Sequence, residues 1–193
     1  SESDIQGKLD QLWNHYFKGD DNSKVYYDKG TEAYMYDSGN GDVRSEGMSY
    51  GMMICVQTNH HDEFDKLWAF AKNHMLHTSG QWQGNFAWQC GTDGSVKDQN
   101  CAPDGEMYFM MSLLFAANRW GNDGKYNYME DAQFVLKNMI KGSNGSLFNE
   151  QYKVVTFQPY NCSDYSDPSY DLPAFVDLFS RWSTTNNSFW KDA

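Results

Sequence analysis

Apolar residues recur at spacings of three and four near the start of the chain. In residues 5–17 they are Ile5, Leu9, Leu12, Trp13 and Tyr16. This spacing places them on one side of a helix whose remaining surface is polar. The pattern therefore predicts an amphipathic first helix.

The next stretch, residues 18–44, is rich in turn-forming residues. Gly19, Gly30 and the run SGNGD at 38–42 separate two short aromatic runs, VYY and AYMY. Turn signals that bracket short aromatic or β-branched runs are typical of strands and extended loops. We therefore expect short strands or extended segments in this stretch.

Two helices of different character are predicted from residue 45 onward. Residues 45–59, SEGMSYGMMICVQTN, carry apolar side chains on nearly every face, with Ser45 as the expected N-terminal cap. Residues 61–77 alternate apolar residues with Asp, Glu and Lys and so keep one polar face. We expect the first helix to be buried on most sides and the second to cover it from outside.

The same couplet of an inner and an outer helix recurs along the chain. Residues 103–120 are rich in Met, Phe, Leu and Ala, and residues 126–141 form a second amphipathic partner. A third couplet begins at Leu172, with Pro173 near the first turn of its helix, which runs to about Ser183. Six helices in this order predict an all-α protein that resembles part of a barrel of helical hairpins.

Length, charge and aromatic content narrow the class of protein. The 193 residues suit one domain or part of a larger one, with residues 1–193 in a single domain, and no run of about 18 apolar residues is present to span a bilayer. A net charge of −11 disfavours nucleic acid and anionic membranes as partners. Aromatic residues make up 17% of the chain, which fits a wet cleft lined with rings that stack on sugars, although most rings are expected in the core.

The cysteines and histidines indicate no metal centre. No CxxC pair is present, the histidines are scattered, and the cluster at 37–42 lacks the full calcium-loop spacing. Cys55 is expected to be a buried thiol, whereas Cys90 and Cys101 flank a polar loop that a disulfide could close. The first residues contain no apolar signal segment, so a signal peptide was removed or never existed, and the compartment stays open.

Two carboxylates stand out because each opens a strongly apolar helix. Glu46 is subject to opposing influences: the helix N-terminus favours its anion, whereas burial would favour a neutral acid able to donate a proton. Asp104 is expected to accept backbone amide hydrogens, which would lower its pKa and keep it ionised. Each could instead be an ordinary residue at a helix start. As a pair they should face the same end of the assembly, as glycosidase chemistry requires.

Four motifs resemble glycoside hydrolase family 8 in order and spacing. They are DVRSEGMSYGMM at 42–53, FAWQC at 86–90, APDGEMYFMMSLLFAANRWG at 102–121 and DPSYDLPAF at 167–175. The resemblance spans essentially the whole chain and is strongest to the reducing-end-xylose-releasing exo-oligoxylanases of that family. It implies an (α/α)6 barrel and an inverting mechanism on β-1,4-linked sugars, with an oligosaccharide substrate and no cofactor.

The resemblance also implies roles for five residues. Glu46 falls on the family's general acid, and Asp104 falls on the carboxylate that holds the sugar at the cleavage subsite. Arg44 lies beside the acid, Trp88 resembles a stacking platform, and Tyr170 resembles a ring near the reactive centre. Arg44, Trp88 and Tyr170 are therefore the expected substrate-binding side chains.

Two departures from the family pattern bear on the expected function. Asp171 stands where the family motif usually has His, which would alter a local hydrogen bond without touching the acid. The chain also carries only about half the helices of such a barrel and lacks the motif with the catalytic base. We therefore expect the N-terminal half of one barrel, whose exposed apolar faces call for a C-terminal half, as a second chain or a lost fragment, that supplies the base.

Other activities are compatible with the same residues. Endo-xylanase, endoglucanase and chitosanase activities would use the same chemistry on a different polysaccharide or at internal bonds instead of chain ends. A protein of another class, a sugar-binding remnant without turnover, would keep the cleft and Asp104 but lack the base.

Overall fold

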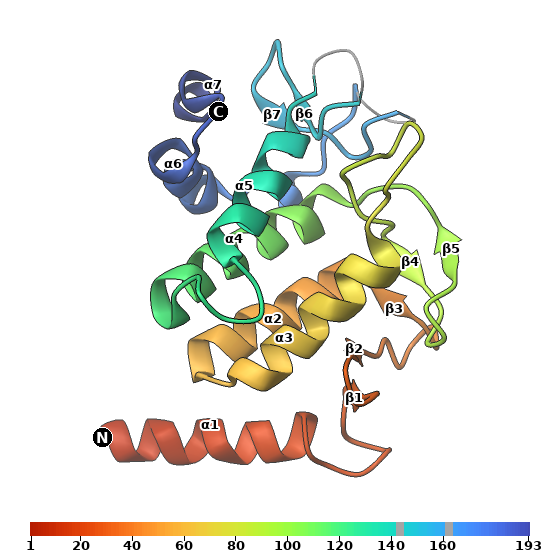
Figure 1. Ribbon diagram of the computed structural model, residues 1–193, viewed down its shortest axis with the longest axis vertical. Helices are drawn as coiled ribbons and strands as arrows, with labels where there is room; N and C mark the ends of the chain where they lie inside the picture. Colours follow the sequence, from red (N-terminus) through yellow and green to blue (C-terminus); the bar gives the residue numbers. More distant parts are fainter. Residues whose placement is uncertain (142–144, 161–163) are drawn as a thin grey trace.

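The computed structural model describes residues 1–141, 145–160 and 164–193, and helices form most of it (Figure 1). The helices in these ranges are α1 (Glu2–Tyr16), α2 (Ser45–Thr58), α3 (His61–Phe70), α4 (Pro103–Trp120), α5 (Tyr128–Met139), α6 (Pro173–Trp182) and α7 (Asn187–Asp192). A π-helical turn, Ala71–Met75, continues α3, and a short 3-10 helix covers Pro168–Tyr170. The six predicted helices are present, and α7 is an additional one that the apolar pattern did not reveal.

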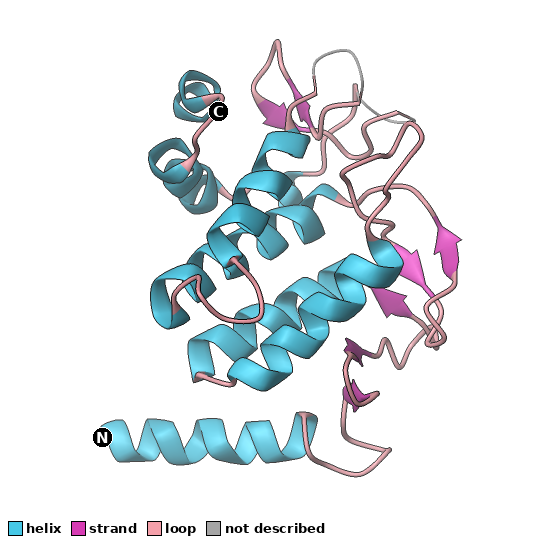
Figure 2. Ribbon diagram, in the orientation of Figure 1, coloured by secondary structure: helices cyan, strands magenta, loops and turns pink. Residues whose placement is uncertain are grey.

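Short strands lie in the connections between helices (Figure 2). As the turn-rich stretch predicted, β1 (Tyr26–Asp28) pairs antiparallel with β2 (Ala33–Met35). A three-stranded sheet contains β3 (Val43–Arg44), β4 (Gln89–Cys90) and β5 (Val96–Asp98), while β6 (Phe148–Asn149) pairs with β7 (Val154–Val155). Because β3 runs directly into α2, the small sheet fixes the place where that inner helix begins.

The central helices form hairpins in which one member is buried. α2 packs against α3, and α4 packs against both α2 and α5, so that α2 and α4 lie in the middle of the fold (Figure 1). Buried residues occur on most sides of α2 and α4, whereas α3 and α5 keep a polar outer face. The predicted alternation of inner and outer helices is confirmed for these two hairpins.

The two inner helices start without a side-chain cap. Arg44 precedes α2 in an extended conformation and Ser45 is already the first helical residue, so the predicted Ser45 cap is wrong. α4 begins at Pro103, whose fixed φ suits the first position of a helix. The amide of Ser45 instead donates to the carbonyl oxygen of Trp88 at 2.9 Å. The start of α2 is therefore tied to the segment that carries Trp88.

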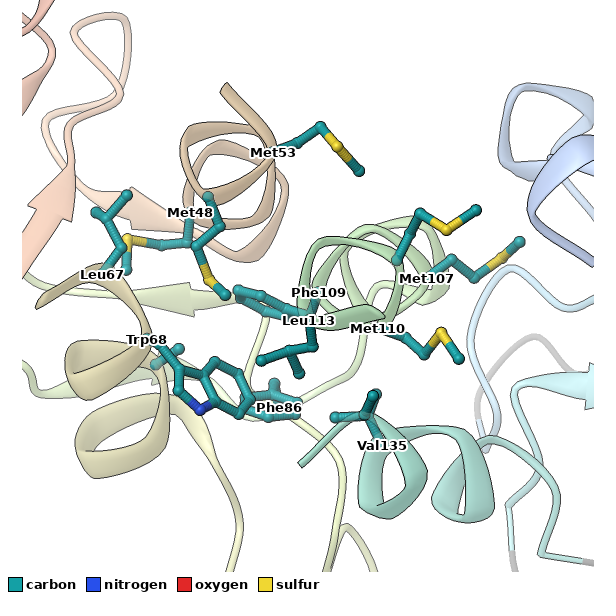
Figure 3. Close-up of a cluster of buried hydrophobic side chains, with 14 of the residues drawn as sticks. Met48, Met53, Leu67, Trp68, Phe86, Met107, Phe109, Met110, Leu113 and Val135 are labelled. Carbon is teal, nitrogen blue, oxygen red and sulfur yellow. The ribbon is translucent and has the colours of Figure 1, made fainter. Parts of the chain in front are cut away.

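A methionine-rich core joins the hairpins. Figure 3 shows side chains at its centre: Met48 and Met53 from α2, Leu67 and Trp68 from α3, Phe86 from the connection that follows, Met107, Phe109, Met110 and Leu113 from α4, and Val135 from α5. Methionine has a flexible, unbranched side chain that fills irregular gaps between larger groups. Burial of each large apolar side chain contributes about 1.5–3 kcal/mol, so this core is the main source of cohesion between the hairpins.

Much of the apolar stripe of α1 is exposed. Ile5 is 64% exposed, Tyr16 is 45% exposed, and Leu9 and Leu12 are each 39% exposed. Trp13 is the one buried residue of the helix. The predicted amphipathic helix is confirmed, and most of its apolar side is exposed in this structure.

The inner helices also expose apolar side chains along one edge. Tyr50 and Ile54 of α2 are 41% and 42% exposed, and Phe115 of α4 is 37% exposed. These three residues and the α1 stripe are together called the open faces below. Inner helices of a closed barrel are covered on every side, so the exposure of Tyr50, Ile54 and Phe115 shows that the described residues do not close a barrel by themselves.

The described cysteines are free thiols. Cys55, Cys90 and Cys101 are buried and unpaired, so the disulfide considered for Cys90 and Cys101 is not formed, while the prediction for Cys55 is confirmed. Cys162 lies outside the described residues. Within the described ranges, none of the helices combines the length and the apolar character needed to cross a membrane.

Candidate active site

α2 and α4 start side by side because a glycine lies where they meet. A Cβ atom on Gly105 would come within 2.7 Å of Ser45 Oγ and 3.1 Å of the Ser45 carbonyl carbon. Glycine is the residue that permits so close an approach of two backbones. The contact brings the first turns of both helices together, and with them Glu46 and Asp104, which face the same end of the fold as predicted.

Asp104 is almost completely enclosed, with 6% of its surface exposed. The hydroxyl of Tyr50 donates a hydrogen bond to its Oδ2 atom at 3.3 Å, and Oδ1 has no hydrogen-bond partner among the described residues. Burial, and next the charge of Glu46, raise the pKa of Asp104 to about 6, against the opposing effects of the Gly105 amide and the Tyr50 hydroxyl. The expected lowering of this pKa is wrong, because desolvation outweighs the favourable backbone amide.

Glu46 lies half-buried in a groove beside α2. The groove holds about 460 Å³, and its lining includes Arg44, Glu46 and Tyr50 together with Met35 and Tyr36 of the preceding segment. Within the site, Ser45 Oγ lies 3.4 Å from Glu46 Oε2 and can donate to it. Because the groove is open, a ligand can reach the Glu46 carboxyl group.

Arg44 is held in place beside Glu46 by two aspartates. Its Nε atom lies 3.0 Å from Asp37 Oδ2 and 3.2 Å from Asp42 Oδ1. Gln89 in turn donates to the other oxygen of Asp42 at 2.5 Å, across the β3–β4 pairing. The guanidinium carbon of Arg44 lies 5.1 Å from the centre of the Trp88 ring, which is within the range of a cation–π contact.

Trp88 is fixed through its backbone on both sides. Its amide donates to the carbonyl oxygen of Asn100 at 2.8 Å, and its carbonyl oxygen accepts from the amide of Ser45 at 2.9 Å. The side chain remains partly exposed. Trp88 therefore offers a ring close to the start of α2 without being part of the core, as the stacking prediction requires.

Tyr170 reaches the same place from the far end of the chain. It ends the 3-10 helix that Asp167 caps, and its ring stacks on Phe157 with ring centres 5.8 Å apart. Burial and next the charges of Asp104 and Glu46 raise the pKa of the Tyr170 hydroxyl, which places that hydroxyl within their electrostatic reach. The neighbouring Asp171 is exposed.

The structure thus brings together all five side chains predicted from the sequence: Arg44, Glu46, Trp88, Asp104 and Tyr170. They come from the starts of α2 and α4 and from two connections that lead into helices. A reachable carboxyl group can protonate a leaving oxygen, while a second carboxylate with an unused oxygen can accept a hydrogen bond from a sugar hydroxyl. Rings beside both provide flat apolar surface for a sugar.

Two residues in or behind the site were not identified from the sequence. The sequence pattern did not single out Tyr50, although its spacing of four residues from Glu46 places both on one side of α2. Glu106 went unnoticed, although an acidic residue inside a strongly apolar helix is itself a signal. It is fully buried, and its Oε1 atom accepts the amide hydrogen of Phe86 at 2.7 Å.

The described residues offer no ligand set for a metal ion: in residues 1–141, 145–160 and 164–193, no three His, Cys, Asp or Glu side chains are grouped suitably.

The fold is that of a family of carbohydrate-cleaving enzymes, and the sequence matches this family directly. The profile of Glycosyl hydrolases family 8 matches residues 31–192, and the chain belongs to this family. The all-α class and the assignment to about half of an (α/α)6 barrel are thereby confirmed.

Within this family, the chain is similar to particular xylose-releasing enzymes. Over 100% of its length the chain is 41% identical to the reducing-end xylose-releasing exo-oligoxylanase Rex8A of Paenibacillus barcinonensis, and 40% identical to the reducing end xylose-releasing exo-oligoxylanase of Halalkalibacterium halodurans. The structure of Rex8A complexed with xylose matches it with a TM-score of 0.95 and 41% identity, over 100% of this chain and 52% of that one. The chain spans about half the length of the curated relatives it matches, 52% and 51% for these two.

Proposed function

We propose that the complete protein is an inverting glycoside hydrolase that cleaves β-1,4-xylosidic bonds of xylo-oligosaccharides and releases xylose from their reducing ends. The pairing of Glu46 with Asp104 at the shared start of α2 and α4 carries this proposal. The two carboxyl groups lie close enough for the charge of Glu46 to raise the pKa of Asp104. The two relatives described above supply the substrate class, since both are named as reducing-end xylose-releasing exo-oligoxylanases.

Glu46 is the proposed general acid. Its carboxyl group lies in the open groove, where a glycosidic oxygen can approach it. Transfer of its proton to that oxygen allows the sugar on the reducing-end side to depart as an alcohol. Such a proton transfer typically accelerates a reaction by about 10²–10⁴-fold.

Asp104 is the carboxylate proposed to hold the sugar at the cleavage subsite. With a pKa of about 6 it is ionised at neutral pH. Oδ2 is occupied by Tyr50, whereas Oδ1 has no partner among the described residues. A buried acceptor without a partner costs about 1–3 kcal/mol, and a sugar hydroxyl that donates to Oδ1 would remove that cost.

Arg44, Trp88 and Tyr170 are the proposed substrate-binding side chains. The Trp88 ring is partly exposed and suits stacking on the apolar face of a xylose. The Nε atom of Arg44 pairs with the carboxylates of Asp37 and Asp42, and the guanidinium has further N–H donors for sugar hydroxyls. The electrostatic influence of both carboxylates on the Tyr170 hydroxyl supports a place for it at the same subsite.

The base that activates water is proposed to come from the rest of the barrel. In an inverting enzyme the acid and the base are about 6.5–9.5 Å apart, which leaves room for the attacking water. The relatives are about twice as long as this chain, and the open faces are the surfaces that further helices would cover. Residues 1–193 would then be one part of a single barrel domain, completed in the same chain or by a second one.

Hydrolysis of xylotriose by the complete protein tests the proposed function. We expect xylose and xylobiose as products, and the xylobiose should first appear as the α-anomer by NMR because an inverting attack converts the β-linkage. Glu46→Gln should lower the rate by roughly 100- to 10 000-fold with little change in xylotriose affinity. Glu130→Gln, which removes an exposed carboxyl group on α5, is the matched control and should keep the parental rate.

Each other outcome selects a different function. Xylotriose that binds without being cleaved would indicate a sugar-binding remnant. Faster cleavage of cello- or chito-oligosaccharides would indicate endoglucanase or chitosanase action, and cleavage within long xylan would indicate an endo-xylanase. Near-parental hydrolysis of xylotriose by Glu46→Gln would remove Glu46 from the role of acid.

A further inference from the structure

Glu106 is a buried carboxyl group that the proposed reaction does not use. It lies two residues after Asp104 on α4, and residues at that separation point to different sides of a helix. Asp104 therefore belongs to the side of the sugar site, whereas Glu106 lies fully buried on another side. A carboxyl group is costly to bury, so a purely cohesive role would be served better by an apolar residue of similar size.

Glu106 contacts the segment leading to Trp88, at the Asn85 side chain and at the backbone of Phe86. Its Oε1 atom accepts the amide hydrogen of Phe86 at 2.7 Å. A buried amide needs an acceptor, and an apolar side chain at position 106 would leave this one without it. Burial raises the pKa of Glu106 to about 7, with the Phe86 amide and then the charge of Lys141 acting in the opposite direction.

The segment around Phe86 is attached to the fold at several points. Lys141 donates through Nζ to the carbonyl oxygen of Gln83 at 2.6 Å and also contacts the Asn85 side chain. The Phe86 ring is buried against Phe109, with ring centres 5.0 Å apart. Glu106 supplies the acceptor for the Phe86 amide, two residues before Trp88.

Trp88 connects this segment to both carboxylates of the site. Its carbonyl oxygen accepts the amide of Ser45, immediately before Glu46, and its ring lies against Arg44. A displacement of Phe86 would therefore be transmitted over two residues to the ring and to the start of α2.

We propose that Glu106 is a positioning residue of the sugar site: by holding the Phe86 amide, it places the Trp88 ring against Arg44 in the position that receives a sugar. This inference rests on the proposed sugar-binding role of Trp88. It assigns Glu106 no contact with the substrate. Its effect on affinity therefore passes through Trp88 and disappears when the Trp88 ring is absent.

A double-mutant cycle tests this route. The background is the complete protein carrying Glu46→Gln, which prevents turnover. Calorimetry measures xylotriose binding to this background and to the background with Glu106→Leu, with Trp88→Ala or with both. We expect Glu106→Leu to weaken binding about tenfold, as coupled contacting residues do, and Trp88→Ala to weaken it roughly 5- to 150-fold, as loss of an aromatic platform does. In the double variant the Glu106 change should add less than about a twofold loss.

Three further variants separate positioning from simple loss of stability. Glu106→Gln keeps an oxygen acceptor for the Phe86 amide and should bind xylotriose within about twofold of the parent. Glu106→Asp keeps the carboxyl group but shortens its reach, so it should lose affinity as Glu106→Leu does, and it serves as the test if Glu106→Leu fails to fold. Leu113→Ala, a buried change on the same helix, should lower the melting temperature without changing affinity.

The outcomes that overturn the inference are distinct from those that overturn the proposed function. Independent, multiplying losses from Glu106→Leu and Trp88→Ala would show that Glu106 does not act through Trp88. An equal loss in Glu106→Gln and Glu106→Leu would show that the Phe86 contact is not what matters. Parental affinity in Trp88→Ala would also overturn the inference, while the effect of Glu46→Gln on hydrolysis would still decide whether the protein is a glycosidase.

Discussion

The hydroxyl of Tyr50 donates to Oδ2 of Asp104 across 3.3 Å and so joins the two inner helices at the candidate site. Tyr50 lies four residues after Glu46 on α2, whereas Asp104 lies in the first turn of α4. The bond occupies one oxygen of the buried carboxylate and leaves the other for a ligand. Tyr50 therefore acts on the ionisation of Asp104 as well as on its orientation.

Removal of the Tyr50 hydroxyl should change the pH dependence of hydrolysis. The hydrogen bond favours the Asp104 anion, so Tyr50→Phe should raise the pKa of Asp104 further above its usual range. If Asp104 must be ionised, the acidic limb of the kcat/KM profile moves to higher pH, and the rate near pH 5 falls about two- to fivefold. A basic limb that moves to higher pH, with the acidic limb unchanged, would show instead that the neutral acid is the active form.

Loss of the Asp104 charge should affect both binding and rate. Asp104→Asn keeps the size of the side chain but removes the anion proposed to hold a sugar hydroxyl, so KM should rise and kcat should fall. Based on hydrogen bonds to charged groups, we expect about 1.5–3 kcal/mol in kcat/KM. Asp123→Asn, at an exposed position, is the control. Steady-state kinetics on xylotriose measure kcat and KM of each variant. An unchanged KM in Asp104→Asn would argue against a contact between Asp104 and the sugar.

A methyl group at Gly105 should separate the two carboxylates. The added Cβ would lie 2.7 Å from Ser45 Oγ and 3.0 Å from Ser45 Cβ, so α2 and α4 must move apart. Gly105→Ala should lower the unfolding free energy by about 1–3 kcal/mol, as overpacking does, and also reduce hydrolysis. Gly124→Ala, whose Cβ would meet nothing within 4 Å, should do neither. Parental stability in Gly105→Ala would mean that the helix starts tolerate a wider spacing.

Glu106 should make the protein less stable as pH rises. Its pKa is raised from 4.5 to about 7 in the folded state. Below about pH 4.5 both states carry the proton and no stability is lost; as pH rises toward 7 the unfolded chain releases it more readily, so folding stability falls. Glu106→Gln should therefore reduce the loss of stability between pH 5 and 7, by denaturant titration at each pH. The same slope in parent and variant would contradict the raised pKa.

The helices could be predicted from the sequence because their apolar patterns are long. Residues 103–120 matched α4 at both ends. The π-helical turn at Ala71–Met75 and the short α7 were missed, because neither changes an apolar pattern over enough residues to be recognised. The exposure of the α1 stripe could not be predicted, because a pattern shows which side of a helix is apolar and not what covers it.

The candidate site was predictable in its residues and less so in its electrostatics. Glu46 and Asp104 were identified because each opens an apolar helix, and their proximity follows from the packing of α2 on α4. The raised pKa of Asp104 depends on how many atoms surround it, which the sequence does not contain. Glu106 depends on a contact with Phe86, twenty residues earlier in the chain, which only the folded structure reveals.

The pairing of helices that are neighbours in the sequence has a consequence for how the protein folds. α2 packs on α3, α4 on α5 and α6 on α7, each pair adjacent in the chain, and the larger α2–α4 contact joins neighbouring hairpins. Closing a short stretch of chain costs less entropy than closing a long one, and proteins dominated by local contacts fold quickly. Because each hairpin joins helices that are close in the sequence, its formation closes only a short stretch of chain, which favours fast folding.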